Sequence, residues 1–308
     1  MERVRIGTRG SLLAMTQTNM VVELLQRHWP QLEVEIHQIK TSGDILYNQN
    51  LALVGGKGLF LKEIEEALLA DQVDIAVHSM KDVPVDVHPD LEFSCCLERE
   101  DPRDIFISRN GAKLEDMPAG SVIGTCSTRR RAQLLRINSE LQVVPLRGNV
   151  NTRLGKLQAG GMDGIVLALA GLKRLGLQEV INNAQIMGLD QMTPAVTQGI
   201  ITIEHRRNDA GMAAFLAPLN HGPSMLRAQA ERAYMEIVQG NCTTPAAGHA
   251  EFMPKESGSS ATLMRFYAMY AGDKTSGEYK YVLHSGEGGA IEAARALGRQ
   301  AGRMVLNA

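Results

Sequence analysis

The sequence is poor in aromatic residues and nearly balanced in charge. Aromatic side chains make up only 4% of its 308 residues, so platforms for stacking nucleic-acid bases are scarce. The 32 basic and 34 acidic side chains leave a formal net charge of -2, which argues against a general electrostatic attraction to DNA. We therefore expect no nucleic-acid partner.

Cysteine and long apolar runs are also scarce. The four cysteines include no Cys-x-x-Cys pair, and the eight histidines form neither a His-x-x-x-His nor a His-Glu-x-x-His motif, which argues against a disulfide framework and a metal site. No run of eighteen uncharged apolar residues occurs, so we expect no membrane-spanning helix. The first residues lead into a strand-like segment without an apolar signal core, and we expect a cytoplasmic protein.

Basic residues gather in one segment. Residues 129–156 contain seven basic side chains and one acidic side chain, in a chain that has no basic excess as a whole. Arginine forms bidentate hydrogen bonds with a carboxylate, which lysine cannot do. The segment therefore suggests a small, multiply anionic ligand that is held by arginine.

The first half of the chain alternates between strand and helix patterns. An apolar strand pattern ends before Gly7, and Ser11 is a suitable cap for the helix that follows. The alternation predicts a largely parallel sheet. The elements expected here are a strand at 4–6, a helix from 12, a strand at 34–39, a helix at 60–70 and a strand at 73–77.

The same alternation restarts near residue 121. Two strings show the same pattern of a strand end, a Gly-Thr turn and a hydroxyl residue that can cap a helix. They are Ile6-Gly7-Thr8-Arg9-Gly10-Ser11 and Ile123-Gly124-Thr125-Cys126-Ser127-Thr128. A helix N-terminus offers free N–H groups to an anion, so a repeat of two similar α/β domains would provide two such sites. Two unrelated strand-to-helix turns are the alternative, since such turns are common in α/β folds.

The last ninety residues have a different texture. They predict a helix at 223–238, strands at 247–252, 263–270 and 279–284, and a terminal helix at 289–306. Three strands flanked by helices indicate a small α+β domain. Hinges between the first two domains are expected at 98–102 and 192–198, and the polar segment 41–58 is too long for an ordinary connection.

Four residues could carry chemistry on the pattern alone. Asp82 follows an apolar strand, where ligands of parallel sheets gather, although an aspartate before a proline is more often a turn former. Arg147 and Arg153 flank a Gly-Asn turn, whereas arginines on a helix usually form a solvated face. Cys242 lies in a loop between a helix and a strand, and exposure is what thiol reactivity requires.

Several strings in order resemble the porphobilinogen deaminases, also called hydroxymethylbilane synthases. They run from residue 1 to about residue 250, and the last sixty residues match only in texture. The strings are Gly7-Thr8-Arg9-Gly10-Ser11, Val54-Gly55-Gly56-Lys57-Gly58-Leu59-Phe60, Asp74-Ile75-Ala76-Val77-His78-Ser79-Met80-Lys81-Asp82-Val83-Pro84, Glu98-Arg99-Glu100-Asp101-Pro102-Arg103-Asp104, Ser127-Thr128-Arg129-Arg130, Leu146-Arg147-Gly148-Asn149-Val150, Thr152-Arg153-Leu154 and Ala170-Gly171-Leu172-Lys173-Arg174-Leu175-Gly176.

The resemblance implies a specific activity. The family joins four porphobilinogen units head to tail with release of ammonia, and hydrolysis then frees the linear hydroxymethylbilane of the tetrapyrrole (porphyrin and haem) pathway. It implies one dipyrromethane cofactor per chain, attached to Cys242 through a thioether. It also implies a monomer that passes its product to uroporphyrinogen-III synthase. A non-catalytic solute-binding module or an inactive paralogue that binds a small polycarboxylate remains the alternative.

The resemblance further implies an α/β fold of three domains. Two are similar, periplasmic-binding-protein-like α/β domains, at 1–98 with 199–217 (the catalytic aspartate side) and at 103–193 (the arginine-rich side). The third, at 221–308, is a small α+β domain with a three-stranded sheet and the cysteine loop.

The resemblance also implies roles for individual residues, as follows. The catalytic group is Asp82, Lys81, Arg9 and Gln198. The cofactor-binding group is Cys242, Asp82, Lys81, Ser79, Lys57, Ser127, Arg129, Arg130, Arg147, Gly148 and Arg153. The substrate-binding group is Arg9, Ser11, Arg147, Arg153 and Arg174.

Two positions depart from the family pattern. The family usually reads Pro-Ala-x-Gly-Gln-Gly, and Thr197 stands at the first of these glycines. If that position requires a positive φ, a β-branched residue is strained there. Asn241 replaces the second of two glycines that usually precede the cysteine, a milder change because asparagine tolerates the left-handed region.

Overall fold

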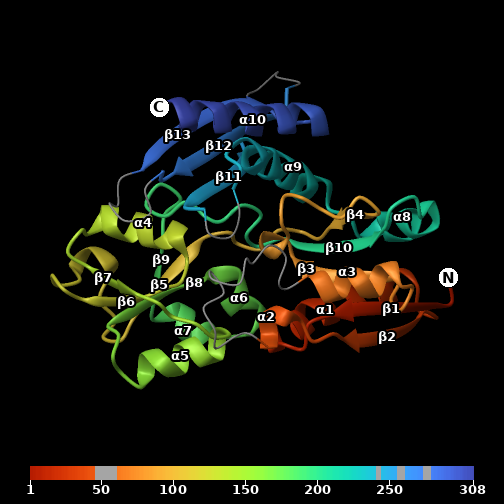
Figure 1. Ribbon diagram of the computed structural model, residues 1–308, viewed down its shortest axis with the longest axis horizontal. Helices are drawn as coiled ribbons and strands as arrows, with labels where there is room; N and C mark the ends of the chain where they lie inside the picture. The colour runs from red at the N-terminus through yellow and green to blue at the C-terminus, as the bar shows by residue number, and fades with distance from the viewer. Residues whose placement is uncertain (46–60, 241–243, 255–260, 273–278) are drawn as a thin grey trace. The chain divides into compact units, whose positions relative to one another are not determined.

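The computed structural model describes residues 1–45, 61–240, 244–254, 261–272 and 279–308 (Figure 1). By its internal contacts the chain forms two units. Unit 1 contains Met1–Glu100 and Gly199–Met225, and unit 2 contains Asp101–Gln198 and Leu226–Ala308. The three predicted domain ranges stay a prediction.

Unit 1 contains a five-stranded sheet. Its strands are β1 (Arg3–Thr8), β2 (Glu33–Gln38), β3 (Ile75–Ser79), β4 (Leu91–Cys96) and β10 (Ile201–Arg206). They lie in the order β2-β1-β3-β10-β4, and β1 is parallel to both β2 and β3. β10 is antiparallel to its neighbours β3 and β4.

Helices cover both faces of this sheet. They are α1 (Leu12–His28), α2 (Ser42–Ile45), α3 (Lys62–Leu69), η2 (Met80–Asp82), α8 (Ala210–Leu216) and η4 (Ala217–Leu219). Ile75 and Val77 of β3 belong to the same buried cluster as side chains of α1 and α8. Ala76 packs instead with side chains of α3. Because successive strand residues point to opposite faces, α1 and α8 cover one face and α3 covers the other.

Unit 2 contains a second five-stranded sheet. Its strands are β5 (Asp104–Ser108), β6 (Val122–Gly124), β7 (Gln142–Val144), β8 (Gly164–Ala168) and β9 (Gln185–Ile186). They lie in the order β7-β6-β8-β5-β9, with β6 parallel to β7 and β8 and β5 antiparallel to β8 and β9. The helices are η3 (Leu114–Asp116), α4 (Thr128–Ile137), α5 (Val150–Gln158), α6 (Leu169–Arg174) and α7 (Gln178–Asn182).

The two sheets have the same order and the same strand directions, which confirms the predicted repeat. The turns compared in the sequence are also alike. Ser11 caps α1 by accepting the Ala14 N–H at 3.2 Å, and Ser127 caps α4 by accepting the Arg130 N–H at 3.3 Å. Three neighbouring strands in each sheet are parallel, as predicted. The antiparallel strands β10 and β5 were not among the predicted elements.

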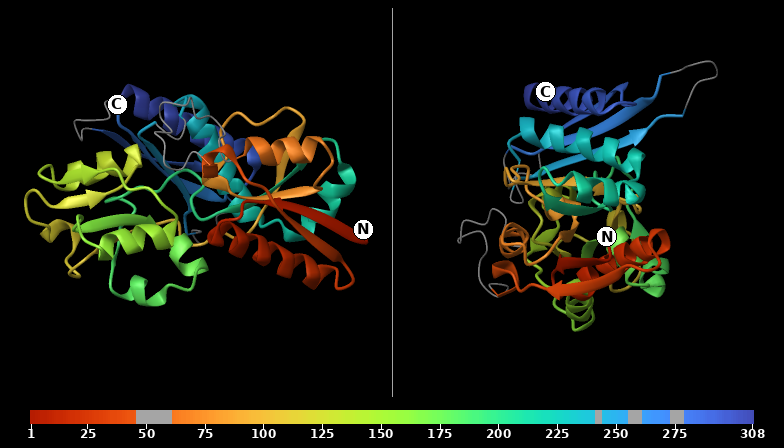
Figure 2. Two further views of the ribbon diagram at one scale, coloured as in Figure 1. Left: turned by 60° about the horizontal axis from the view of Figure 1, so that its bottom comes forward. Right: turned by 90° about the vertical axis from the view of Figure 1, so that its right-hand side faces the viewer.

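The C-terminal part of unit 2 is the predicted small α+β fold. The strands β11 (Ala246–Phe252), β12 (Leu263–Tyr270) and β13 (Lys280–Glu287) form an antiparallel sheet in sequence order. Helices α9 (Gly222–Ile237) and α10 (Ile291–Asn307) share a buried cluster with it, and Figure 2 shows α10, in blue, alongside the strands. A Cβ on Gly298 of α10 would lie 1.9 Å from the Ala230 carbonyl oxygen, so glycine permits this close helix contact.

The segment around Thr197 has the backbone conformation anticipated from the sequence. Thr197 has a φ of 59°, in the left-handed region, and is 1% exposed. Its N–H donates to the buried Glu231 carboxylate, and its hydroxyl donates to the Val196 carbonyl at 2.7 Å. These contacts hold a β-branched residue in a conformation that costs about 1–2 kcal/mol relative to the right-handed region.

Thr197→Gly is therefore expected to raise the free energy of unfolding by about 0.5–1 kcal/mol, since relief of strain exceeds the entropy that glycine loses on folding. Urea denaturation measures the change. Thr193→Gly is the control, because Thr193 is equally buried but is not among the residues with positive φ, and this variant is expected to be less stable than the native chain. A Thr197→Gly variant as unstable as the control would contradict the assignment of strain.

Candidate functional site

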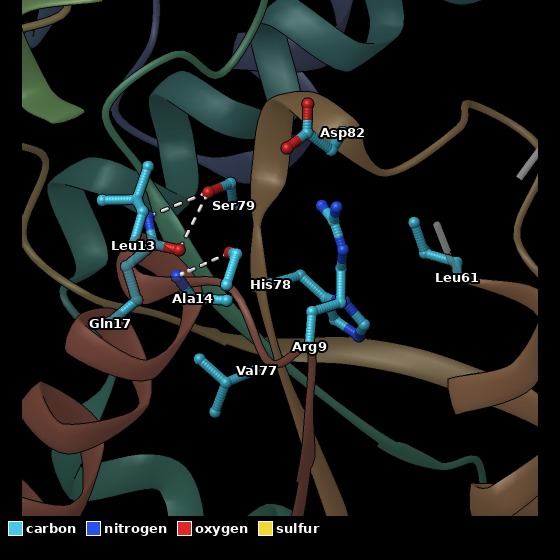
Figure 3. Close-up of a pocket in the computed structure, with 10 residues that line it drawn as sticks. Arg9, Leu13, Ala14, Gln17, Leu61, Val77, His78, Ser79 and Asp82 are labelled. Carbon is cyan, nitrogen blue, oxygen red and sulfur yellow. Dashed lines mark hydrogen bonds between the residues drawn. The ribbon is translucent and has the colours of Figure 1, made fainter. Parts of the chain in front are cut away.

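A pocket in unit 1 lies where β1 and β3 end. These neighbouring strands are parallel, so their carboxyl ends share one edge of the sheet, the usual place for ligands in α/β folds. Arg9 follows β1, Ser11 caps α1, Ser79 ends β3, and Asp82 ends the single turn of η2. The pocket is lined by Arg9, Ser11, Leu13, Ala14, Gln17, Leu61, Val77, His78, Ser79 and Asp82 (Figure 3).

One side of the pocket is fixed by a buried amide. The Gln17 side chain of α1 is 3% exposed and contacts the Ser79 hydroxyl through both amide atoms, at 2.8 and 2.9 Å. This contact ties the end of β3 to α1 and orients the hydroxyl at the pocket wall (Figure 3).

Asp82 brings an accessible carboxylate to the pocket. The residue is exposed, and in the described part of the chain no side chain or N–H forms a hydrogen bond or an ion pair with its carboxylate. Figure 3 shows the Arg9 guanidinium extending into the space below Asp82, with the His78 ring behind the stem of Arg9. The pocket thus combines an acidic group with a cation and two hydroxyls.

Several predicted site residues lie elsewhere. Lys81 is exposed beside Asp82 but does not line the pocket. Gln198 belongs to unit 2, where it is 1% exposed and donates to the Pro102 carbonyl at 2.7 Å and to Asp104 at 3.0 Å. Lys57 and Cys242 lie outside the described residues. The site roles assigned by alignment all stay predictions.

The other described cysteines differ in exposure. Cys95 and Cys96 of β4 are fully buried, as expected for at least one of them, and burial raises the pKa of the Cys95 thiol to about 12. Cys126 is exposed. Only Cys126, among the described cysteines, therefore offers an accessible thiol that competes with the predicted attachment site.

The predicted arginines of unit 2 follow three parallel strands. Ser127 and the arginines of α4 follow β6, Arg147 follows β7, and Arg174 ends the helix after β8. Asn149 caps α5 by accepting the Thr152 N–H at 2.9 Å. The predicted site residues that follow these strands are Ser127, Arg129, Arg130, Arg147, Gly148, Arg153 and Arg174. Parallel strands end on one side, so this edge of the sheet is rich in cations.

Gly148 shapes this edge through its backbone. Its φ is 137°, which a residue with a side chain rarely adopts. The Gly148 carbonyl accepts a hydrogen bond of 2.6 Å from Arg153 Nε, which orients that side chain.

Arg129 and Arg130 have an internal partner that the sequence did not reveal. Arg129 Nη1 lies 2.7 Å from Asp104 Oδ2, and Arg130 Nη2 lies 2.6 Å from Asp104 Oδ1. Burial opposes ionisation of Asp104, but the charges and hydrogen bonds of the two arginines outweigh it and hold its pKa well below the ordinary value. One carboxylate thus serves two buried guanidinium groups, and a positive charge remains for an anionic ligand.

Gln17 and His78 were missed as pocket residues. Gln17 is a polar residue on the buried face of α1, and His78 directly precedes Ser79 in a strand with both faces covered. A polar side chain on an otherwise apolar face was the available signal.

The described part of the chain shows no group of three or more histidine, cysteine or acidic side chains placed to hold a metal ion. Its helices include none long and apolar enough to cross a bilayer.

Fold and pocket together define an α/β protein with a cation, a carboxylate and two hydroxyls at the carboxyl ends of parallel strands, where α/β proteins usually bind small ligands. Solved structures with partly similar folds are the BvgS VFT2 domain of Bordetella pertussis (16% identical, TM-score 0.42, 70% of this chain and 85% of that one) and an ancestral arginine-binding protein (15%, TM-score 0.41, 71% and 91%).

Sequence comparison identifies the particular family. A family model described as "Porphobilinogen deaminase, dipyromethane cofactor binding domain" matches residues 4–214. The porphobilinogen deaminase of Syntrophomonas wolfei is 42% identical over 99% of this chain and 98% of its own length. That of Geobacter sulfurreducens is 44% identical over 89% and 84%. The chain belongs to the porphobilinogen deaminase family, whose members are transferases with a dipyrromethane cofactor.

Asp104→Asn is expected to lower the free energy of unfolding by about 3–5 kcal/mol, because it leaves two buried guanidinium groups without their counter-charge. Glu140→Gln, which removes an exposed carboxylate from the same unit, should change stability by less than about 0.5 kcal/mol. Guanidinium chloride denaturation of both variants measures the difference.

The same carboxylate predicts a sign for the pH dependence. The pKa of Asp104 is lower in the folded chain than its value of about 4 in the unfolded chain, so the ionised carboxylate stabilises the fold fully above about pH 4. This stabilisation is lost as the pH falls from about 4 toward the folded-state pKa. Asp104→Asn should therefore flatten the loss of stability between about pH 4 and pH 2. If the variant loses as much stability between pH 4 and pH 2 as the native chain does, the assigned ion pairs are wrong.

Proposed function

We propose that this chain joins four porphobilinogen units head to tail, releases one ammonia for each, and hydrolyses the linear product to hydroxymethylbilane. Membership of the family supports the reaction. The observation that carries the proposal is the accessible Asp82 carboxylate in a pocket shared with Arg9, Ser11 and Ser79.

Asp82 would stabilise the charge that develops on the substrate. Loss of ammonia from porphobilinogen leaves an azafulvenium cation whose charge is shared with the pyrrole nitrogen. A carboxylate about 4 Å from this cation, at an effective dielectric near 20, is worth about 4 kcal/mol. Asp82 has no described internal partner to neutralise it, so its charge is available to the substrate.

Arg9 and Ser11 would bind the substrate's side arms. Each porphobilinogen carries an acetate and a propionate, and a guanidinium binds such groups by paired hydrogen bonds. Arg9 stands at the end of β1 and Ser11 at the N-terminus of α1, where the helix dipole also favours an anion. Orientation by these two groups would set the pyrrole nitrogen toward Asp82.

The dipyrromethane, attached through Cys242, supplies the primer to which substrate units are added. The donor set of unit 2 fits a group that carries several carboxylates. Arg130 Nε is buried and has no hydrogen-bond partner in the described part of the chain, although the same side chain binds Asp104. Ser127, Arg129, Arg130, Arg147, Gly148 and Arg153 would hold the cofactor with Ser79, Lys57, Lys81 and Asp82, and Arg147, Arg153 and Arg174 would also bind substrate.

The remaining parts of the proposal come from the family alone. They are the three domains at 1–98 with 199–217, 103–193 and 221–308, a cytoplasmic monomer, and delivery of the product to uroporphyrinogen-III synthase. Lys81 and Gln198 complete the proposed catalytic group.

Intact-protein mass spectrometry tests the attachment site. After expression with porphobilinogen available, the purified chain is expected to carry the mass of two additional pyrrole units. Cys242→Ala should abolish this mass, whereas Cys126→Ala, which removes an exposed thiol, should retain it. If only the Cys126→Ala variant lacks the added mass, the cofactor is attached to Cys126 and not to Cys242.

Asp82→Asn is expected to lower kcat roughly a thousandfold, the equivalent of about 4 kcal/mol, while the fold remains intact. Ammonia release from porphobilinogen measures it. Asp90→Asn is the control, because Asp90 is an exposed carboxylate of unit 1 outside the pocket. If the Asp82→Asn variant turns over substrate at nearly the native rate, Asp82 does not take part in the reaction.

A further inference from the structure

The two hydroxyls of the pocket differ in what their partners leave open. Ser11 Oγ accepts the Ala14 N–H at 3.2 Å, so its own hydrogen remains available to a ligand. Ser79 Oγ lies 2.8 Å from Gln17 Nε2 and 2.9 Å from Gln17 Oε1. One side-chain amide therefore contacts the Ser79 hydroxyl twice and controls its direction.

Amide chemistry fixes the position of the Ser79 hydrogen. An amide nitrogen only donates and an amide oxygen only accepts, so Gln17 Nε2 donates to Oγ and Gln17 Oε1 receives the hydroxyl hydrogen. A half-turn of the amide that exchanges its nitrogen and oxygen still leaves one of each beside Oγ, so the assignment does not depend on which is which. Neither side chain titrates, so the arrangement does not depend on a protonation state.

Burial holds the hydrogen in this position. Gln17 is buried, and among the described residues Ser79 is the only donor to Gln17 Oε1. If the hydroxyl turned to donate into the pocket, this amide oxygen would become an unsatisfied buried acceptor, which is costly. A ligand that accepts hydrogen bonds must offset that cost, whereas a ligand that donates meets a remaining lone pair of Oγ without it.

The pocket thus has a donor side and an acceptor side. Arg9 and Ser11, at the end of β1 and the start of α1, offer N–H and O–H donors. Ser79 and Asp82, at the end of β3 and in the turn that follows it, offer acceptors. All four residues line the pocket (Figure 3).

Porphobilinogen has the same division. Its acetate and propionate accept hydrogen bonds. Its aminomethyl group is a primary amine that is protonated at neutral pH and carries three N–H donors, next to the pyrrole N–H. The pyrrole nitrogen has one hydrogen, which the proposed mechanism directs to Asp82. The ammonium group is therefore the donor that remains for Ser79.

We propose that Ser79, with its hydrogen committed to Gln17, accepts a hydrogen bond from the aminomethyl ammonium of porphobilinogen. This inference rests on the proposed function. It gives Ser79, until now grouped with the cofactor, a contact with substrate, and it makes Gln17 a positioning residue. When the C–N bond breaks, its electron pair leaves with ammonia and the positive charge remains on the pyrrole. The Ser79 contact is thus strongest in the bound substrate and contributes to affinity.

Ser79→Ala is expected to raise the KM for porphobilinogen about tenfold with kcat within threefold of the native value, in steady-state assays of ammonia release. An analogue with a methyl group in place of the aminomethyl group lacks the ammonium, so its Kd should change by less than twofold. Ser11→Ala is the matched comparison. It removes a hydroxyl from the donor side and should weaken both ligands alike.

Two results contradict the assignment of Ser79. If Ser79→Ala weakens the methyl analogue as much as porphobilinogen, the hydroxyl binds the ring or a carboxylate arm. If it weakens neither ligand, the hydroxyl binds no substrate.

Gln17→Met tests the positioning role, because methionine fills similar space but provides no acceptor for the Ser79 hydrogen. This variant should raise the KM about threefold to tenfold. The double variant with Ser79→Ala should bind porphobilinogen no more weakly than Ser79→Ala alone, since Gln17 acts through Ser79. Additive losses would show that Gln17 acts independently and would remove its role. Urea denaturation checks that each variant is folded.

Calorimetry separates this inference from the proposed function. In the Asp82→Asn background turnover is slow, so the Kd values of porphobilinogen and of the methyl analogue are measured directly, with and without Ser79→Ala. Native protein that binds porphobilinogen but releases no ammonia defeats the proposed function, and the two Kd values still decide the role of Ser79. An active native protein in which Ser79→Ala leaves the Kd of porphobilinogen unchanged defeats the inference alone.

Discussion

The parallel pairing of β1 with β3 is the constraint on which the pocket depends. Because the two strands run in one direction, the residues that follow them meet at one edge, although they are about seventy positions apart in the chain. The alternation of side chains then separates their roles. Ser79 faces α1 and contacts Gln17, while His78 faces α3 and contacts Glu204. One strand end thus supplies a hydroxyl on one side and an imidazole on the other.

The second sheet repeats this construction with a different complement of side chains. Where unit 1 has an accessible aspartate, unit 2 has arginines after its three parallel strands. Buried guanidinium groups need a counter-charge, and Asp104 of the antiparallel strand β5 provides it for Arg129 and Arg130. Gln198 donates a hydrogen bond to the same carboxylate, so the end of the first stretch of unit 2, Asp101–Gln198, is fixed to the same ion pairs.

The sequence was most informative where local chemistry determines structure. The two serine caps, the glycine-threonine turns and the three-stranded C-terminal sheet were predicted from residue types at fixed spacing, and the structure has them. Strain at Thr197 was expected only if the family's glycine there needs a positive φ, and the structure meets that condition. The family motif located Asp82 and Arg9, and the structure brings both to one pocket.

Long-range partners could not be predicted from one sequence. The pairing of β10 with β3 joins residues more than a hundred positions apart, and β10 contains buried Glu204 and His205, which weaken an apolar strand pattern. Asp104 likewise pairs with residues of α4 only because β5 inserts beside β8. Such contacts depend on topology, which local patterns do not contain.

The insertion of β10 between β3 and β4 has a consequence for biosynthesis. When residue 100 leaves the ribosome, the position between β3 and β4 in the first sheet is empty, and β4 has no hydrogen-bonded neighbour until residues 201–206 are made. At about 5–20 residues per second this delay lasts roughly 5–20 s. The sheet of residues 104–186 contains all its strands within one uninterrupted stretch and can form during that interval. The nascent N-terminal segment therefore presents open strand edges to chaperones for longer than any later part of the chain.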